Sequence, residues 1–147
     1  MKYNNPILIL LLAVFLMVGF QNKKSIKGTW SLVKFYDAEK KLTIHKPKEE
    51  KSVAPYITFE DDELTGKATG FTMSNRFTVN YTASSTKLKF DSLLITEVNE
   101  IGWAESFVYF MFRPATYHFK ADSLIFSHSD GDQLFWVSVK EENEWGL

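Results

Sequence analysis

The chain has 147 residues and a formal charge of −1 at pH 7, with 17 Lys and Arg residues against 18 Asp and Glu residues. A charge so close to zero gives no electrostatic footprint for nucleic acid, which we exclude as a partner. Cysteine is absent, which excludes disulfides, thiol catalysis and thiolate metal sites. The length suits one domain.

An apolar run at residues 6–20 follows a short start that contains Lys2. As a helix this run spans about 22 Å, less than the ~30 Å hydrocarbon core of a bilayer. The pattern predicts a signal peptide or an N-terminal membrane anchor at residues 1–20, followed by a polar tether at 21–26. We therefore expect an exported protein of the cell envelope, periplasmic or membrane-anchored, whose residues 6–20 contact the membrane if they are not cleaved.

Residues 17–20, Met-Val-Gly-Phe, resemble the end of a bacterial lipoprotein signal. Phe20 stands where the lipid-bearing Cys belongs, so lipidation is not expected. Ordinary cleavage favours small residues at the −3 and −1 positions, which this segment supplies poorly. Two outcomes stay open: an uncleaved N-terminal anchor, or inefficient processing.

The folded part is predicted over residues 27–140. Aromatic residues make up 16% of the chain, and strand-rich cores favour such side chains. Residues 28–36 are predicted to form the first strand, with a bulge where the apolar phase shifts at 32–33. The polar, lysine-rich stretch 37–54 is interpreted as a long solvated loop.

Clear period-two alternation follows. Residues 55–60 are predicted as a strand with Ile57 and Phe59 on one face, and residues 66–81 as two extended segments that form a hairpin. The second segment places three apolar side chains on one face: Phe77, Val79 and Tyr81.

Gly66 and Gly70 indicate a bend, a bulge or the close crossing of another strand. A polar break at 72–76 separates the two segments. Its Asn75 and Arg76 could bind an anion, but a turn or capping role is the preferred interpretation of Asn75.

A strand at 87–91, extended to 96, precedes one predicted helix at 100–112, which Pro114 ends. Apolar side chains cover about 200° of this helix, whereas an ordinary packed helix needs ~100°. The excess could close the end of a barrel, contact a partner or rest on a membrane, and deep burial is favoured.

Three predicted strands complete the domain, with a hairpin turn at Asp130-Gly131. The last strand, 134–139, is apolar on both faces, which favours a central position or cover by the helix. Residues 141–147 are a charged tail.

Taken together, these elements predict a mainly β fold class: a small antiparallel β-barrel of about eight strands, closed by one amphipathic α-helix.

The hairpin resembles the META domain (HslJ-like) family of small bacterial envelope proteins, whose pattern runs Gly-Phe-x-Gly-Cys-Asn-x-Phe-x-Gly-x-Tyr. The matching residues are Gly70, Phe71, Asn75, Phe77 and Tyr81. Further matches are the opening Gly28-Thr29-Trp30-x-Leu32, the strand at 55–59, Glu105 and the closing strands. The resemblance covers nearly all of residues 26–140.

The departures from this pattern also carry information. Met73 and Val79 replace two glycines, which implies that the backbone at both positions is less crowded or less strained than in the family. Ser74 occupies the Cys position, and the family's second Cys is absent too. The resemblance therefore implies neither a disulfide nor redox chemistry here.

The resemblance implies a non-enzymatic domain with a stress-related or envelope-maintenance role and no defined ligand. Candidate ligand-lining or motif residues are Trp30, Gly70, Asn75, Phe77, Tyr81 and Trp136. The Gly28-x-Trp30 opening also resembles the first strand of lipocalin-like domains. The alternative is thus a carrier that holds a small apolar ligand inside the barrel, in a cavity lined by Trp30, Phe59, Phe77 and Trp136.

No catalytic, cofactor or metal site is predicted. The sequence contains no Ser-His-Asp ordering, Walker loop or Rossmann fingerprint. His118 and His128 could approach each other on neighbouring strands, but their spacing matches no zinc pattern. The acidic run 60–63 is interpreted as a solvated turn. A protein partner or a small apolar ligand is the expected partner class, and the sequence defines no oligomeric state.

Overall fold

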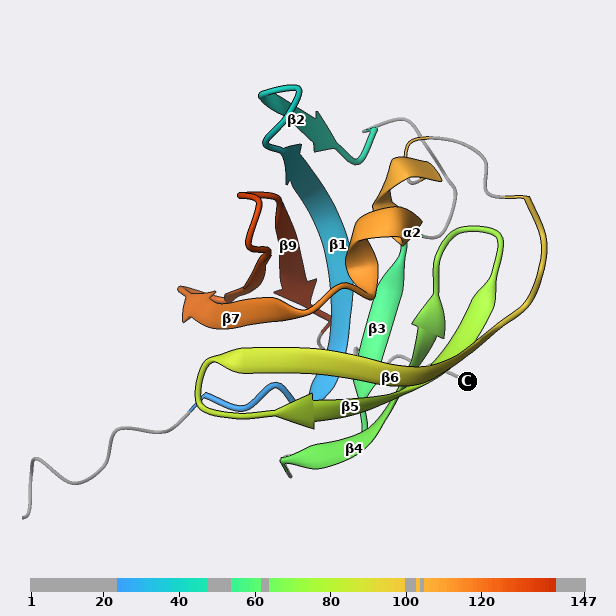
Figure 1. Ribbon diagram of the computed structural model, residues 1–147, viewed down its shortest axis with the longest axis vertical. Coiled ribbons are helices and arrows are strands. Elements are labelled where there is room, and N and C mark those ends of the chain that lie inside the picture. The colour runs from blue at the N-terminus through green and yellow to red at the C-terminus, as the bar shows by residue number, and fades with distance from the viewer. Residues whose placement is uncertain (1–23, 48–53, 62–63, 100–102, 104, 140–147) are drawn as a thin grey trace, which may run out of the picture.

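The computed structural model describes residues 24–47, 54–61, 64–99, 103 and 105–139. The leader at 1–20, residues 21–23 of the tether and the tail at 141–147 lie outside the described residues. The described part forms nine strands and one helix (Figure 1). The strands are β1 (Gly28–Asp37), β2 (Leu42–His45), β3 (Tyr56–Phe59), β4 (Thr65–Phe71), β5 (Arg76–Ala83), β6 (Lys87–Ile95), β7 (Ala115–Lys120), β8 (Ser123–Ser127) and β9 (Gln133–Ser138), and the helix is α2 (Glu105–Met111).

The strands make a closed antiparallel barrel with one additional strand. The hydrogen-bonded order is β2-β1-β3-β4-β5-β6-β7-β8-β9, and β1 also pairs with β9, which closes the barrel. The predicted bulge in the first strand is confirmed, because the β1–β9 register shifts between Leu32 and Lys34. The predicted mainly β barrel with one short helix is confirmed as well.

Alternating side chains build the core. Along β5 the inward residues Phe77, Val79 and Tyr81 are buried, while Arg76 and Asn80 are exposed. In β9, Leu134 and Trp136 are buried, and the strand lies between β8 and β1. The ring of Phe107 in α2 meets Trp136 edge to face, with 5.7 Å between ring centroids. The last strand is therefore both central in the sheet and covered by the helix, as predicted.

Close crossing of the chain explains both glycines of β4. A Cβ on Gly70 would lie 2.1 Å from the carbonyl oxygen of Tyr56 and 2.5 Å from Cζ of Phe77. A Cβ on Gly66 would lie 2.8 Å from the hydroxyl oxygen of Tyr81. Larger residues cannot fit at Gly70 without moving the neighbouring backbone, so the interpretation as a close crossing is confirmed.

Two predicted elements need correction. The stretch 37–54 is not one long loop, because β2 forms there and pairs with β1 from Lys34–His45 to Asp37–Leu42. A turn at 38–41, in which Lys41 has a φ of 51°, returns the chain onto β1. The helix ends at Met111, one residue before the predicted end, and Trp103 lies in a turn before its first residue. Residues 100–102 and 104 of the predicted helix are outside the described part.

Met73 also departs from expectation. Its φ is 146°, a conformation that glycine adopts far more readily than methionine. The expectation of a less strained backbone is therefore wrong at Met73. Val79 is a fully buried residue of β5 whose φ is not positive, and the β5–β6 register shifts between its neighbours Thr78 and Asn80.

Candidate functional site

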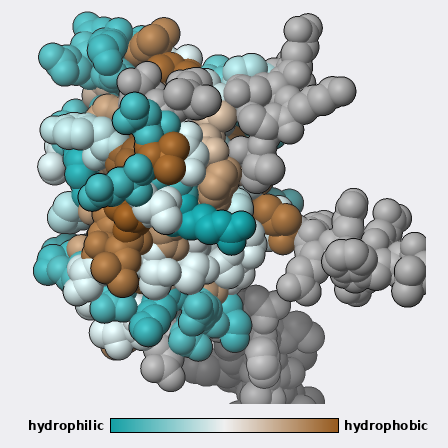
Figure 2. Space-filling view, turned by 90° about the vertical axis from the view of Figure 1, so that its right-hand side faces the viewer, coloured by the Kyte–Doolittle hydropathy of each residue, from teal (hydrophilic) through white to brown (hydrophobic). Residues whose placement is uncertain are grey.

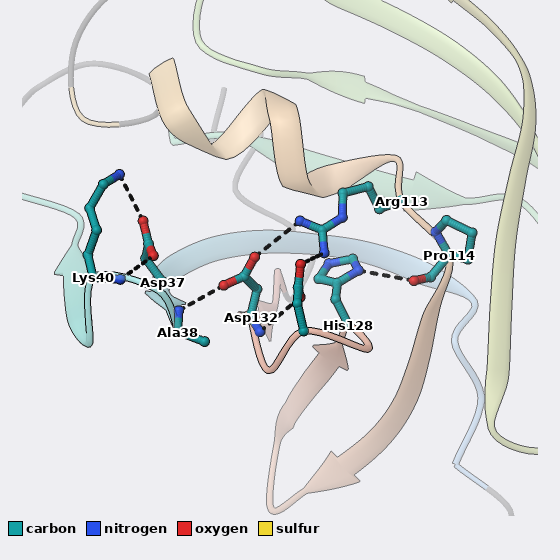
Figure 3. A network of polar contacts seen from close by, with 8 residues as sticks. Asp37, Ala38, Lys40, Arg113, Pro114, His128 and Asp132 are labelled. Carbon is teal, nitrogen blue, oxygen red and sulfur yellow. Dashed lines mark hydrogen bonds and ion pairs between the residues drawn. The ribbon is translucent and has the colours of Figure 1, made fainter.

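Three segments far apart in sequence meet around Arg113 at one end of the barrel (Figure 3). They are the turn after β1, the segment between α2 and β7, and the turn between β8 and β9. Their interacting polar residues, the Arg113 network, are Asp37, Lys40, Arg113, His128, Asp130 and Asp132, which bond to each other and to backbone groups of Ala38 and Pro114.

Arg113 connects the helix to the β8–β9 turn. One guanidinium nitrogen donates to Oδ2 of Asp132 over 3.1 Å, and the other donates to Oδ2 of Asp130. Oδ1 of Asp132 accepts from the backbone N–H of Ala38 over 2.8 Å, which ties the same turn to the end of β1. The guanidinium also lies over the ring of Phe110, 5.4 Å from its centroid. One buried carboxylate, 6% exposed, thus joins all three segments.

Asp37 and Lys40 form a second ion pair within the turn after β1. The backbone N–H and the ammonium of Lys40 each donate to the carboxylate of Asp37 over 2.9 Å. These two hydrogen bonds hold the pKa of Asp37 below its usual value of 3.8. The same pairing raises the pKa of Lys40. Both groups are therefore charged at neutral pH.

The pKa shifts of Arg113 and Asp130 both favour the charged form, although one pKa is raised and the other is lowered. Desolvation works against both charges. The hydrogen bonds between Arg113 and the two carboxylates outweigh it, so the pKa of Arg113 is raised. For Asp130, the backbone N–H of Asp132 and the guanidinium outweigh desolvation and lower its pKa. Arg113 and Asp130 are therefore both charged at neutral pH.

His128 is the neutral member of the network. Its Nδ1 lies 3.1 Å from the carbonyl oxygen of Pro114, and because a carbonyl only accepts, Nδ1 carries the proton. Desolvation lowers the pKa of His128, and the charge of Arg113 adds to this. Nε2 is buried and has no hydrogen-bond partner among the described residues.

A cleft of about 880 Å³ opens beside this network. Its charged lining residues are Asp37, Glu39, Lys40, Arg113, Asp130 and Asp132, and Tyr109 and Phe110 of α2 form the aromatic wall. Tyr109 is 77% exposed. The four carboxylates outnumber the two cations, but Asp37, Asp130 and Asp132 are already bound to those cations.

The predicted site residues do not gather at this cleft. Trp30, Phe77, Tyr81 and Trp136 belong to the buried core, as does Phe59. The core rings contact one another: Phe59 meets Tyr81 edge to face at 5.1 Å, Phe77 meets Phe112 at 5.1 Å, and Trp136 lies 5.5 Å from Phe126. These side chains fill space inside the barrel, and the carrier hypothesis for that interior stays a prediction.

Asn75 joins the hairpin break to the segment after β6. Its amide nitrogen donates to the carbonyl of Val98 over 2.6 Å, and its Oδ1 accepts from Thr96 Oγ1 and from the backbone N–H of Val98. The residue is 3% exposed, while Arg76 is exposed. This bonding supports a structural role for Asn75.

The two histidines considered together in the sequence are separated in environment. His118 is exposed on β7, whereas His128 is buried after β8. No group of three or more metal-ligating side chains occurs among the residues that the structure describes.

Sequence reasoning weighed Asp130 and Asp132 as metal ligands and preferred a turn, and it did not connect them with Arg113 or Asp37. The sequence signal that could have indicated this network is the presence of charged residues near the ends of three strands and of the helix. No fixed spacing links those positions, because the fold alone brings them together.

Apolar groups interrupt the polar surface on the face shown in Figure 2. In the described part, the large apolar residues that are exposed are Leu42, Leu64, Leu93, Leu94, Val98, Tyr109 and Val139. None of the helices built from described residues has the length and apolar character to cross a bilayer.

Comparisons with known proteins support the fold and the family. The family model described as META domain matches residues 24–141. An NMR structure of a protein from Burkholderia xenovorans is similar with a TM-score of 0.60 and 16% identity, over 78% of this chain and 83% of that chain. A second protein solved by NMR gives a TM-score of 0.54 and 14% identity, over 77% and 91% of the two chains. No curated protein matches the sequence.

Proposed function

The chain belongs to the META domain family, and from this premise we propose that it is a non-enzymatic envelope domain with a stress-related or envelope-maintenance role. Residues 6–20 hold it at the membrane, or release it when they are cleaved. The domain acts by binding a protein or a small molecule and needs no cofactor.

The charge state of the Arg113 network carries the non-enzymatic part of this proposal. A general acid or base works best with a pKa near the operating pH, and buried carboxyls in active sites commonly have raised values. Here the pKa values of Asp37 and Asp130 are lowered, because each carboxylate binds a cation and a backbone N–H. Such carboxylates hold segments together and are poor proton donors at neutral pH.

His128 is the other group that could exchange protons near neutral pH. Its Nδ1–H is engaged by the Pro114 carbonyl, and its Nε2 is shielded from solvent. A substrate in the Arg113 cleft would need to displace the packed network before it reached this nitrogen. The arrangement supports a structural use of the imidazole.

Cell fractionation of the full chain tests the cellular address. We expect the protein in the periplasmic or membrane fraction of a bacterial host, and a matched variant that lacks residues 1–20 in the cytosol. Intact mass then separates the two forms: a chain that starts near Gln21 has lost its anchor, and a full-length chain in the membrane fraction retains it. Full-length protein in the cytosol would contradict the envelope role.

A further inference from the structure

The β6–β7 contact is the weak point of the barrel wall. The two strands pair only at Lys87–Thr116 and Leu88–Ala115, whereas β4 and β5 pair from Thr65–Thr82 to Phe71–Arg76. The next register position would place Pro114 opposite Lys89. Proline has no N–H to donate, so it cannot continue the ladder. From Pro114 backwards the chain leads to the helix, and β6 continues without β7.

A groove of about 540 Å³ lies over this interruption. We call it the seam groove and define it by Lys87, Leu88, Lys89, Pro114, Ala115 and His128. Its volume falls within the roughly 300–1,000 Å³ of small-molecule sites, which are mostly apolar with a few polar groups that orient the ligand. Pro114 is exposed at the groove, and Leu88 and Ala115 are buried beside it.

The charges around the seam groove have one sign. Lys87 and Lys89 line it, and among the described residues no acidic side chain does. Lys89 forms an ion pair with Asp91 at 2.9 Å, but the two side chains are 63% and 48% exposed, and such exposed pairs contribute little. Lys89 can therefore turn toward an anion, and Lys87 has no ion-pair partner among the described residues.

His128 adds a polar atom without a partner. The residue is 5% exposed, and its ring is fixed by the Pro114 carbonyl. Among the described residues that line the groove, Nε2 of His128 is buried and has no hydrogen-bond partner. With its proton on Nδ1, the ring has only an acceptor at Nε2, so His128 takes no part in holding an anion.

We propose that the seam groove binds a small amphiphile with one anionic head and an apolar tail, such as a medium-chain carboxylate. The tail covers Pro114, beside the buried Leu88 and Ala115, and the head lies between the ammonium groups of Lys87 and Lys89. This site is on the outside of the barrel wall, and it depends neither on the cellular address nor on the absence of catalysis.

NMR titration of the full chain tests the site, with octanoate as the probe. We expect saturable shifts of the backbone amides of Leu88, Ala115 and Thr116. Acetate lacks the tail and octylammonium reverses the charge, so each should bind at least about tenfold more weakly. Equal binding of octylammonium, absence of saturable octanoate binding, or shifts centred on the interior or the Arg113 cleft would overturn the proposal.

Matched variants separate the groove from general charge effects. K87Q/K89Q should weaken octanoate binding about tenfold, which corresponds to two modest charge-assisted contacts. K67Q/K120Q removes the same charge at exposed positions of β4 and β7 and should leave the affinity within about twofold. Ser129→Trp, at an exposed residue of the groove lining, should block binding while the remaining spectrum stays folded. Equal weakening by both double variants would contradict the assignment.

Discussion

Met73 holds a glycine-like backbone conformation, with a φ of 146°, in the turn between β4 and β5. Its side chain compensates for part of this strain, because it packs against the core while remaining partly exposed. Hydrogen bonds fix this turn. The backbone N–H of Thr72 donates to the carbonyl of Asn75 over 2.8 Å, and the side-chain amide of Asn75 donates to the carbonyl of Val98. The surrounding bonds therefore impose the conformation on Met73.

Two substitutions at this position separate strain from packing. Met73→Ala removes the side-chain contacts and keeps the strain, whereas Met73→Gly removes both. Because glycine tolerates positive φ, we expect the glycine variant to have a free energy of unfolding about 1 kcal/mol above that of the alanine variant. Urea denaturation measures this difference. An alanine variant that is equal or more stable would show that the turn is relaxed.

At the residue scale, the sequence could predict the roles that follow from alternation and size. The inward residues of β5 and the close crossing at Gly70 belong to this class, because a period of two and a missing Cβ are local signals. The φ of Met73 could not be predicted, since the hydrogen bonds that fix its turn run from Thr72 to Asn75 and from Asn75 to Val98. The contact with Val98, which lies after β6, exists only once the distant segments have come together.

At the scale of elements, the Arg113 network fastens the turn after β1 and the segment after α2 to the β8–β9 turn. His128 lies in the same network. Its ring bonds to the Pro114 carbonyl, and the charge of Arg113 lowers its pKa. A second proton on this imidazole would create a buried cation beside the guanidinium. The packing of the three segments therefore depends on a neutral His128.

Stability should accordingly fall in mild acid. The folded pKa of His128 is lowered from 6.5, so below about pH 6.5 the unfolded chain takes up a proton that the folded chain does not. The free energy of unfolding then decreases as pH falls toward the folded pKa, by at most about 1.4 kcal/mol per pH unit. Asp37 and Asp130 lose their contribution only below their usual value of 3.8.

The His128→Gln variant should flatten the pH dependence between about pH 7 and 5, measured by urea denaturation at each pH. His118→Gln is the matched control, because His118 is exposed on β7, and its profile should follow that of the unsubstituted protein. Identical slopes for all three proteins would mean that His128 does not titrate differently on folding.

Most elements could be predicted from alternation and turn residues, as in β3, β5 and the Asp130-Gly131 turn. The strand β2 was missed although Leu42 and Ile44 alternate with Thr43 and His45, because the run has only four residues, three of them exposed, within a lysine-rich stretch. It exists because β1 offers it a hydrogen-bonding edge. The network around Arg113 was missed because ion pairs between turns leave no periodic signal in the sequence.

At the scale of the whole molecule, one feature positions both candidate sites. The chain between α2 and β7 carries Arg113 toward the β8–β9 turn and Pro114 toward β6. This short segment ends the β6–β7 ladder, opens the seam groove on the outer wall and places the Arg113 network at the end of the barrel. Closure of the barrel wall at this point therefore depends on the short β6–β7 ladder.

An engineered disulfide tests this closure most directly, because the chain has no cysteine of its own. Lys87 and Thr116 are direct partners across the seam, and Cα atoms of antiparallel partners lie about 4.5–5.5 Å apart, within disulfide range. We predict that Lys87→Cys with Thr116→Cys forms an intramolecular bond under mild oxidation and raises the free energy of unfolding by about 2–4 kcal/mol.

Lys89→Cys with His118→Cys, displaced by about 13 Å in register, should not form a bond. Free thiols in the first pair, or equal bonding in both pairs, would contradict a barrel closed at this seam.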